Sequence, residues 1–451
     1  MTTPDTPGGE VPEAQPVRVA RTVGSYGVQL VITALTSFVR VPLMVRALGQ
    51  DSFGLVIVVT SGAPLLLAMC GGGRLASRTL ASESWERGHQ PPLRALTQLA
   101  MRFALAQSAL VLLVAAAPLT YSLLQADGVV GRVEFGAAIA VAGVLCSVAC
   151  VGGIGWGVLE AQGRAVLLNG FGSAVAVFGL LVNWALWRLD AGFFAFATVN
   201  TVTSAAPFYL GFTVPAFRAA LRRTASTASS ATISRQHRAL LIQGWAQNAA
   251  PFSTRAADPA IVSSATGPAD AATLGVAQRL GMLLTVVPLA LEPFVSARVA
   301  RRRPGSNPMG LREAGRLALA YGAVAMIAGL GLVAVGPALA RALAEGEFGA
   351  DRGLFLMIGV AGVLSSMGSV LLAIGTGPVA MRQGTRIDMV CAGLNLVASI
   401  WLAHLIGMVG PVVASIGANV LAIAGRLRVL VRSPEALRET HMVAAVDQEP
   451  L

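Results

Sequence analysis

The sequence consists mainly of long apolar runs separated by short polar segments. A helix needs about 20 apolar residues to cross the hydrocarbon core of a bilayer. Twelve runs meet or nearly meet this length, at 23–47, 52–70, 96–118, 135–158, 165–187, 191–214, 240–263, 273–297, 317–340, 353–376, 386–406 and 409–430. The pattern predicts an all-α polytopic membrane protein with twelve transmembrane helices.

Composition excludes a soluble fold. The chain has 451 residues, of which 55% are hydrophobic and only 12% charged. The mean hydropathy is +0.69. A soluble domain carries about twice this share of charge, because water must solvate its surface. The protein is therefore expected to be solvated by lipid over most of its surface.

The net charge of +11 comes from arginines that recur between the apolar runs. A nucleic-acid-binding protein would gather its basic residues on one domain, so this distribution argues against a nucleic-acid partner. If the twelve helices alternate in direction, most arginines fall on one side of the membrane. The other side receives only Arg46, Arg132, Arg188, Arg341 and Arg352. The positive-inside rule then places both termini in the cytoplasm.

The two halves of the sequence match at several places. The matched residues are separated by 215 to 221 positions, and they are Arg40 with Arg255, Gly49 with Gly267, Gln162 with Gln383, Trp184 with Trp401 and Asn200 with Asn419. Each match joins a helix or turn to the one that comes six helices later. Because six is even, both halves start on the same side of the membrane. We predict a parallel 6+6 repeat, with two six-helix lobes around a central cavity.

A stretch rich in Arg, Ser, Thr and Ala separates the halves and divides the chain into five segments. We expect a disordered cytoplasmic tail at 1–20, an N-lobe with helices 1–6 at 21–217, a cytoplasmic linker at 218–238, a C-lobe with helices 7–12 at 239–432 and a second cytoplasmic tail at 433–451.

Three arginines lie within the predicted helices, where a charge costs at least about 2.5 kcal/mol on insertion scales. Arg40, Arg255 and Arg279 fall at similar depth, in the outer half of the membrane. Guanidinium groups around a cavity would bind an anion, and phosphate or pyrophosphate fits their paired donors best. The alternative is that these side chains reach outward to the lipid headgroups.

Two acidic residues lie near these arginines in the sequence. Asp258 follows Arg255 by three positions, so the two share a helix face and could neutralise one another. Asp258 could instead couple transport to a proton or cation, and Glu292, which precedes Pro293, is a second candidate for coupling or charge pairing. The sequence predicts no catalytic residue, cofactor or metal site, because it has no Walker motif and its four histidines lack metal-ligand spacing.

Several turns resemble the polysaccharide flippases of the multidrug/oligosaccharidyl-lipid/polysaccharide (MOP) exporter superfamily. The segments that carry the resemblance are 46–54 (RALGQDSFG), 258–267 (DPAIVSSATG) with 276–280 (VAQRL), 158–164 (VLEAQGR) with Asn169, 394–397 (LNLV) and 406–410 (IGMVG). They span nearly the whole membrane region. One departure is 71–74 (GGGR), where relatives often carry an acidic residue beside a glycine.

The resemblance implies a function. Members of this family move a polyprenyl-pyrophosphate-linked oligosaccharide or polysaccharide precursor from the inner to the outer leaflet by alternating access. Carried over to this chain, Arg40, Arg255 and Arg279 would hold the pyrophosphate and Asp258 would lie beside them. The resemblance also implies a monomeric, multi-pass protein of a bacterial plasma membrane. Envelope glycosyltransferases or a polymerase would be its partners.

Two alternatives stay open at this point. A cation-coupled multidrug or metabolite exporter would have the same fold, but it would need acidic residues deep in the cavity, for which Asp258 is the candidate. A transport-inactive scaffold for glycan assembly would use the Arg-rich cytoplasmic loops instead. In all three cases the protein is not an enzyme.

Overall fold

The described part of the protein is entirely helical. A computed structural model describes residues 15–68, 131–215, 257–282, 311–343, 352–374 and 378–432, with a few isolated positions between these ranges. The helices are α1 (Gln15–Ala68), α4 (Arg132–Ala161), α5 (Ala165–Arg188), α6 (Phe193–Tyr209), α9 (Asp258–Ala265), α11 (Leu311–Leu343), α12 (Arg352–Ile374), α13 (Pro378–Ile406) and α14 (Gly410–Arg432). The 3-10 helices η1 (Leu210–Thr213) and η2 (Gly407–Val409) extend α6 and join α13 to α14, and a further helix follows α9 at 268–282.

The predicted apolar runs coincide with helices wherever the structure describes them. Six stretches of the described residues are long and apolar enough to cross a membrane. One of these, Arg382–Val431, contains two of the predicted runs, and Gly24–Gly62 covers parts of two others. The run at 96–118 and the linker at 218–238 lie almost wholly outside the described residues. Helix α1 begins at Gln15, so it includes the last residues of the stretch that we expected to be a disordered tail.

The turns between helices repeat along the chain. At Gly49 (φ 75°) the helical path of α1 breaks, which divides it into two helices joined by one residue. Gly267, which follows α9, also has a positive φ and lies 218 positions later. The turn after α5 has its positive φ at Asp190, and the turn after α13 has one at Gly407, 217 positions later. The match of Gln162 with Gln383 has no such counterpart, because Gly163 forms a positive-φ turn whereas Gly384 lies within α13.

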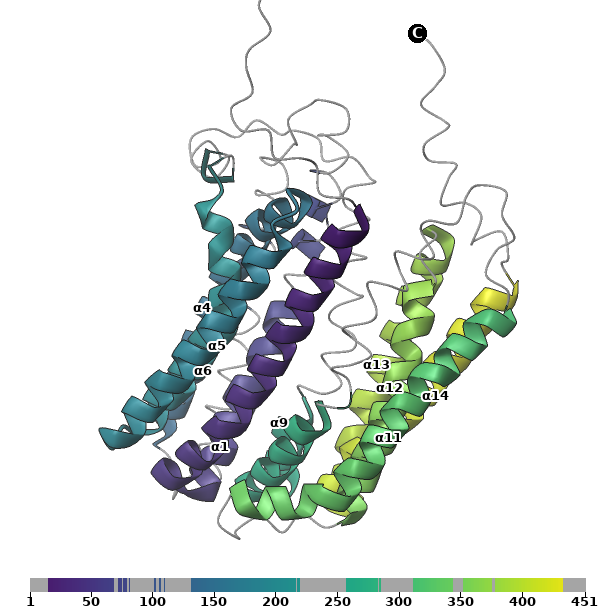
Figure 1. Ribbon diagram of the computed structural model, residues 1–451. Coiled ribbons are helices and arrows are strands. Elements are labelled where there is room, and N and C mark those ends of the chain that lie inside the picture. The colour runs from purple at the N-terminus through teal and green to yellow at the C-terminus, as the bar shows by residue number, and fades with distance from the viewer. Residues whose placement is uncertain are drawn as a thin grey trace, which may run out of the picture.

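The helices form two bundles (Figure 1). In the N half, meaning the described residues up to 219, α1 packs on α4, α5 and α6, and α4 packs on α6. In the C half, from 257 onward, α11 packs on α12, and α14 packs on both α12 and α13. The start of α1 and the end of α14 lie on the same side of the molecule (Figure 1). The described helices therefore form two groups, one from each half of the chain.

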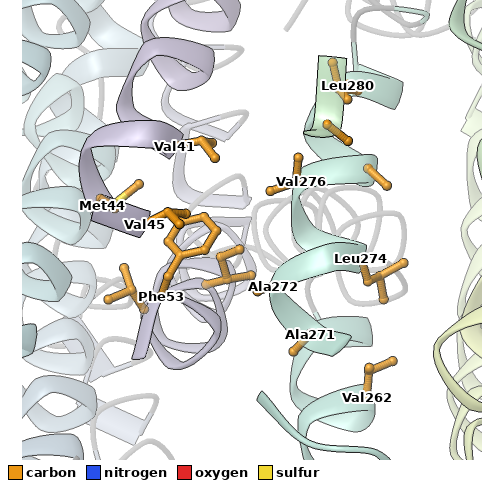
Figure 2. Packing of buried hydrophobic residues seen from close by; sticks show 14 of the residues in the cluster. Val41, Met44, Val45, Phe53, Val262, Ala271, Ala272, Leu274, Val276 and Leu280 are labelled. Atoms are coloured by element: carbon orange, nitrogen blue, oxygen red, sulfur yellow. The ribbon is translucent and has the colours of Figure 1, made fainter. Parts of the chain in front are cut away.

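One apolar cluster joins the two halves. Val41 and Phe53 of α1 face Ala272 and Val276 of the 268–282 helix (Figure 2). The same cluster includes buried residues of α4 and α6 on one side and of α11, α12 and α14 on the other. It lies at the end of the bundle that carries the turns at Gly49 and Gly267, which we call the closed end. The arginine distribution predicts that the closed end faces outward.

Large apolar side chains also cover the outside of the bundles. Leu35, Phe178, Leu181, Ile327 and Leu330 are each more than half exposed. A water-soluble protein does not expose a continuous set of such residues on its helices, because their hydration is unfavourable. These faces are suited to lipid tails.

Tight backbone packing in the N half depends on glycine. A Cβ atom added at Gly155 of α4 would lie 2.1 Å from the carbonyl oxygen of Gly211 in η1. We expect Gly155→Leu to destabilise the protein by at least about 1–3 kcal/mol, because backbone atoms cannot give way. Gly170→Leu is the control, since a Cβ at Gly170 would meet nothing within 4 Å. Thermal unfolding of both variants in detergent checks this, and equal midpoints would contradict it.

Candidate functional site

Arg40 lies inside the N half, with a side chain that is 9% exposed. Its Nη1 donates to Asn200 Oδ1 and to Thr203 Oγ1 of α6, each at 3.4 Å. Its Nη2 donates to the backbone carbonyl of Ala176 on α5. A Cβ at Gly179 would lie 2.6 Å from Nη2, so the guanidinium fits only because α5 has a glycine there. Arg40 therefore points between helices of the N half.

A chain of amide side chains continues from Arg40. Asn200 Nδ2 donates to Asn183 Oδ1 at 2.9 Å and to the carbonyl of Phe196 at 2.8 Å. Asn183 Nδ2 in turn donates to the carbonyl of Gly179 at 2.6 Å. No carboxylate contacts Arg40 in the described part of the chain. Its positive charge is balanced there by neutral dipoles only, which is a costly arrangement in a low-dielectric interior.

Arg279 comes from the other half, on the 268–282 helix. Its guanidinium carbon lies 5.9 Å from the centre of the Phe53 ring on α1, within the range of a cation–π contact. The side chain is partly exposed although its neighbours belong to the apolar cluster. Within the described residues it has no hydrogen-bond or ion-pair partner. Arg40 and Arg279 thus come from opposite halves of the chain, and no contact between them is seen in the described residues.

Asp258 is the first residue of α9 and is 2% exposed. Its Oδ2 accepts a hydrogen bond from Gln278 Nε2 at 3.0 Å, which ties α9 to the neighbouring helix. A carboxylate in the first turn also interacts favourably with the helix dipole. Arg255 and Glu292 lie outside the described residues, so the predicted pairing of Asp258 with Arg255 stays a prediction.

A buried ion pair that the sequence analysis missed links three helices of the C half. Arg426 Nη2 on α14 lies 2.6 Å from Asp388 Oδ1 on α13, and both side chains are nearly inaccessible. Arg426 Nη1 also donates to the carbonyl of Gly368 on α12 at 2.6 Å. The sequence pattern assigned Arg426 to the cytoplasmic helix ends. The available signal was Asp388, an acid at the start of an otherwise apolar run.

Helix α13 carries further buried polar groups on the same face as Asp388. Asn395 and Ser399 follow it by seven and eleven positions, which is close to two and three helical turns. They are 1% and 0% exposed. Neither side chain has a hydrogen-bond partner among the described residues. Such groups are rare in folded proteins and mark this face as more than a packing surface.

The unusual basic residue in the segment 71–74 has a structural role. Arg74 donates from Nε to Glu160 Oε2 of α4 at 3.0 Å and from Nη2 to the other carboxylate oxygen. Trp156 Nε1 donates to Glu160 Oε1 at 3.1 Å, and its ring lies under the Arg74 guanidinium. Arg74 thus supplies a charge that complements Glu160.

No known protein family and no curated protein matches the sequence. Solved structures do match its fold, and transporters of the MOP superfamily are among them. The Lipid II flippase MurJ in an inward closed conformation has a TM-score of 0.66 and 13% identity, covering 91% of this chain and 88% of that chain. An inward-facing multidrug resistance MATE family transporter has a TM-score of 0.60 and 16% identity, covering 92% and 99%.

A third similar structure is a MOP superfamily transporter from Pyrococcus furiosus, described as having a binding pocket of reversed polarity. Its TM-score is 0.56 and its identity 16%, and the match covers 94% of this chain and 96% of that chain. Two of the three are named as transporters and one as a flippase. At these identities the similarity defines the fold and not the substrate.

The Asp388–Arg426 pair gives a prediction about stability. Removing one partner leaves an uncompensated buried charge, so Arg426→Gln should destabilise the protein by about 3–5 kcal/mol. The double variant Asp388→Asn/Arg426→Gln should recover much of this loss, because neither charge then remains. Unfolding midpoints of the two single variants and the double variant form a double-mutant cycle. Additive losses would show that the pair does not couple.

Proposed function

We propose that the chain is a flippase that moves a polyprenyl-pyrophosphate-linked oligosaccharide or polysaccharide precursor from the inner to the outer leaflet by alternating access. In this proposal twelve helices form two six-helix lobes, joined by the linker at 218–238, around a central cavity. Both termini lie in the cytoplasm of a bacterial cell. The protein acts as a monomer in the plasma membrane, beside envelope glycosyltransferases or a polymerase.

The observation that carries the proposal is the pair of guanidinium groups from opposite halves. Arg40 is held by neutral hydrogen-bond partners and Arg279 lies against the Phe53 ring, and no carboxylate contacts either of them in the described residues. Cationic groups without an acidic partner attract an anion. A pyrophosphate group between the halves would accept hydrogen bonds from the Arg279 donors, which have no protein partner there. Arg255 is proposed as a third contact.

The similarity to the Lipid II flippase MurJ supports the same reading. Its name shows that this fold can move a lipid-linked substrate. The paired positive-φ turns at Gly49 and Gly267 support the repeated layout, since each follows the first helix of its proposed lobe. A large headgroup needs a pathway between two rigid bodies, and a parallel repeat around a central axis provides one.

Cation-coupled export is the second candidate, and the comparisons fit it equally. Two of the similar structures are multidrug resistance transporters of the MATE family. The buried carboxylate of Asp258 is the observation in this chain that favours it. An exporter of this kind would release its substrate when the carboxylate binds a proton or a metal cation. Asp258→Asn should then abolish uptake of an organic cation into proteoliposomes, while the flippase proposal expects no such uptake in the wild type.

Binding of inorganic pyrophosphate tests the flippase proposal. Arg279→Ala should weaken binding by roughly tenfold or more, since hydrogen bonds to charged groups contribute about 1.5–3 kcal/mol. Arg279→Lys should recover only part of the loss, because lysine lacks the paired donors of arginine. Isothermal titration of the full-length protein in detergent measures both effects.

Arg188→Ala is the matched control. Arg188 lies over the rings of Trp184 and Trp187 at the end of α5, so it is also an arginine against an aromatic ring. Its replacement should leave pyrophosphate binding unchanged. Equal binding by Arg279→Ala and the wild type would refute the proposed site. Flipping of a fluorescent polyprenyl-pyrophosphate saccharide in proteoliposomes should fall with binding, whereas a scaffold would show no flipping in any variant.

A further inference from the structure

The contact between Arg279 and Phe53 joins the two halves of the protein. Phe53 belongs to the N half, in the part of α1 that follows the break at Gly49, and it is fully buried. Its ring lies between Val45 and the 268–282 helix, near Ala272 (Figure 2). Arg279 extends from that helix in the C half, and its guanidinium carbon is 5.9 Å from the ring centre.

The residues around this contact hold the halves together at the closed end. A Cβ at Gly54 would lie 1.9 Å from the carbonyl oxygen of Pro268, so the backbones touch at this point. A Cβ at Gly275 would lie 2.6 Å from Ile57. Gln50 Nε2 also donates to the carbonyl of Ala269 at 3.4 Å. Separation of the halves at the closed end would break these contacts and would remove Phe53 from Arg279.

The chemistry of the contact suits an arginine that must stay available to an anion. A carboxylate would neutralise Arg279 and compete with an anionic substrate. The face of an aromatic ring attracts the cation without neutralising it. The ring also restricts a long side chain that otherwise adopts many rotamers, which lowers the entropy lost when the anion binds.

We propose that Phe53 is a positioning residue that links the affinity of Arg279 for a pyrophosphate group to closure of the outer end. With the closed end shut, Phe53 orients the guanidinium of Arg279. When that end opens, Arg279 loses its contact with the ring, so its affinity for pyrophosphate falls on the side where the substrate must leave. This inference rests on the proposed function and specifies how release is achieved.

Two variants of Phe53 distinguish a role of its aromatic ring in binding from a role in apolar packing alone. Phe53→Leu keeps an apolar side chain but removes the π face, whereas Phe53→Tyr keeps the face. We expect Phe53→Leu to weaken pyrophosphate binding by about threefold to tenfold, and Phe53→Tyr to stay within about twofold of the wild type. Isothermal titration of inorganic pyrophosphate into the full-length protein measures this.

Phe355→Leu is the control for packing. Phe355 lies in the same apolar cluster and is equally buried, but it packs against Gly336 of α11. It should lose stability as Phe53→Leu does and keep the wild-type affinity for pyrophosphate. If the two leucine variants bind equally well, or if Phe53→Tyr binds as poorly as Phe53→Leu, the positioning role is wrong.

A second variant tests the link to closure. The side chain in Gly54→Leu would clash with the carbonyl oxygen of Pro268. This variant should therefore hold the two halves apart at the closed end and weaken pyrophosphate binding. Adding Phe53→Leu to Gly54→Leu should cause no further loss, because the ring is already away from Arg279. Multiplying losses in the double variant would overturn the link, and the Phe53 and Phe355 variants decide the proposal if Gly54→Leu does not fold.

The same titrations separate this inference from the proposed function. If Arg279→Ala binds pyrophosphate as the wild type does, the proposed site itself fails. If Arg279→Ala loses binding while Phe53→Leu keeps it, only the positioning role of Phe53 fails.

Discussion

A protein surrounded by lipid must satisfy its polar groups internally, and this constraint organises the structure described here. The backbone meets it by forming helices throughout the described residues. The charged side chains meet it in different ways. Asp388 and Arg426 pair with each other, Arg40 is surrounded by amide and carbonyl dipoles, and Arg279 rests on an aromatic ring. A cation that the protein neutralises less completely keeps more of its positive charge to attract an anionic ligand.

The sequence predicted the membrane class and most helix positions, because both follow from the length of apolar runs. It also predicted the turns at Gly49 and Gly267, since few residues other than glycine adopt a positive φ without strain. The sequence did not show that Gly49 alone joins the two helical parts of α1. Helix α1 starts earlier than expected because residues 15–20 are too polar to belong to an apolar run, yet they continue the helix beyond it.

The candidate site was predictable in its residue types and not in its contacts. Arg40 and Arg279 stand out as charges within apolar runs, so composition alone identifies them. Their separate environments depend on which helices pack together over more than a hundred residues, as in the contact of Arg40 with Asn200. The pairing of Arg426 could not be predicted, because only the packing of α12, α13 and α14 shows that its guanidinium turns inward.

The contact of Gly54 with Pro268 has a consequence for how such proteins diverge. Lipid-facing positions accept almost any apolar side chain, so most of the surface can change without cost, in keeping with the 13–16% identities to the similar structures. Position 54 has no such freedom, because any side chain meets a backbone oxygen. Distant relatives that share this way of closing should thus be recognisable by a short, invariant glycine signature at the closed end when the rest of their sequences has become unalignable.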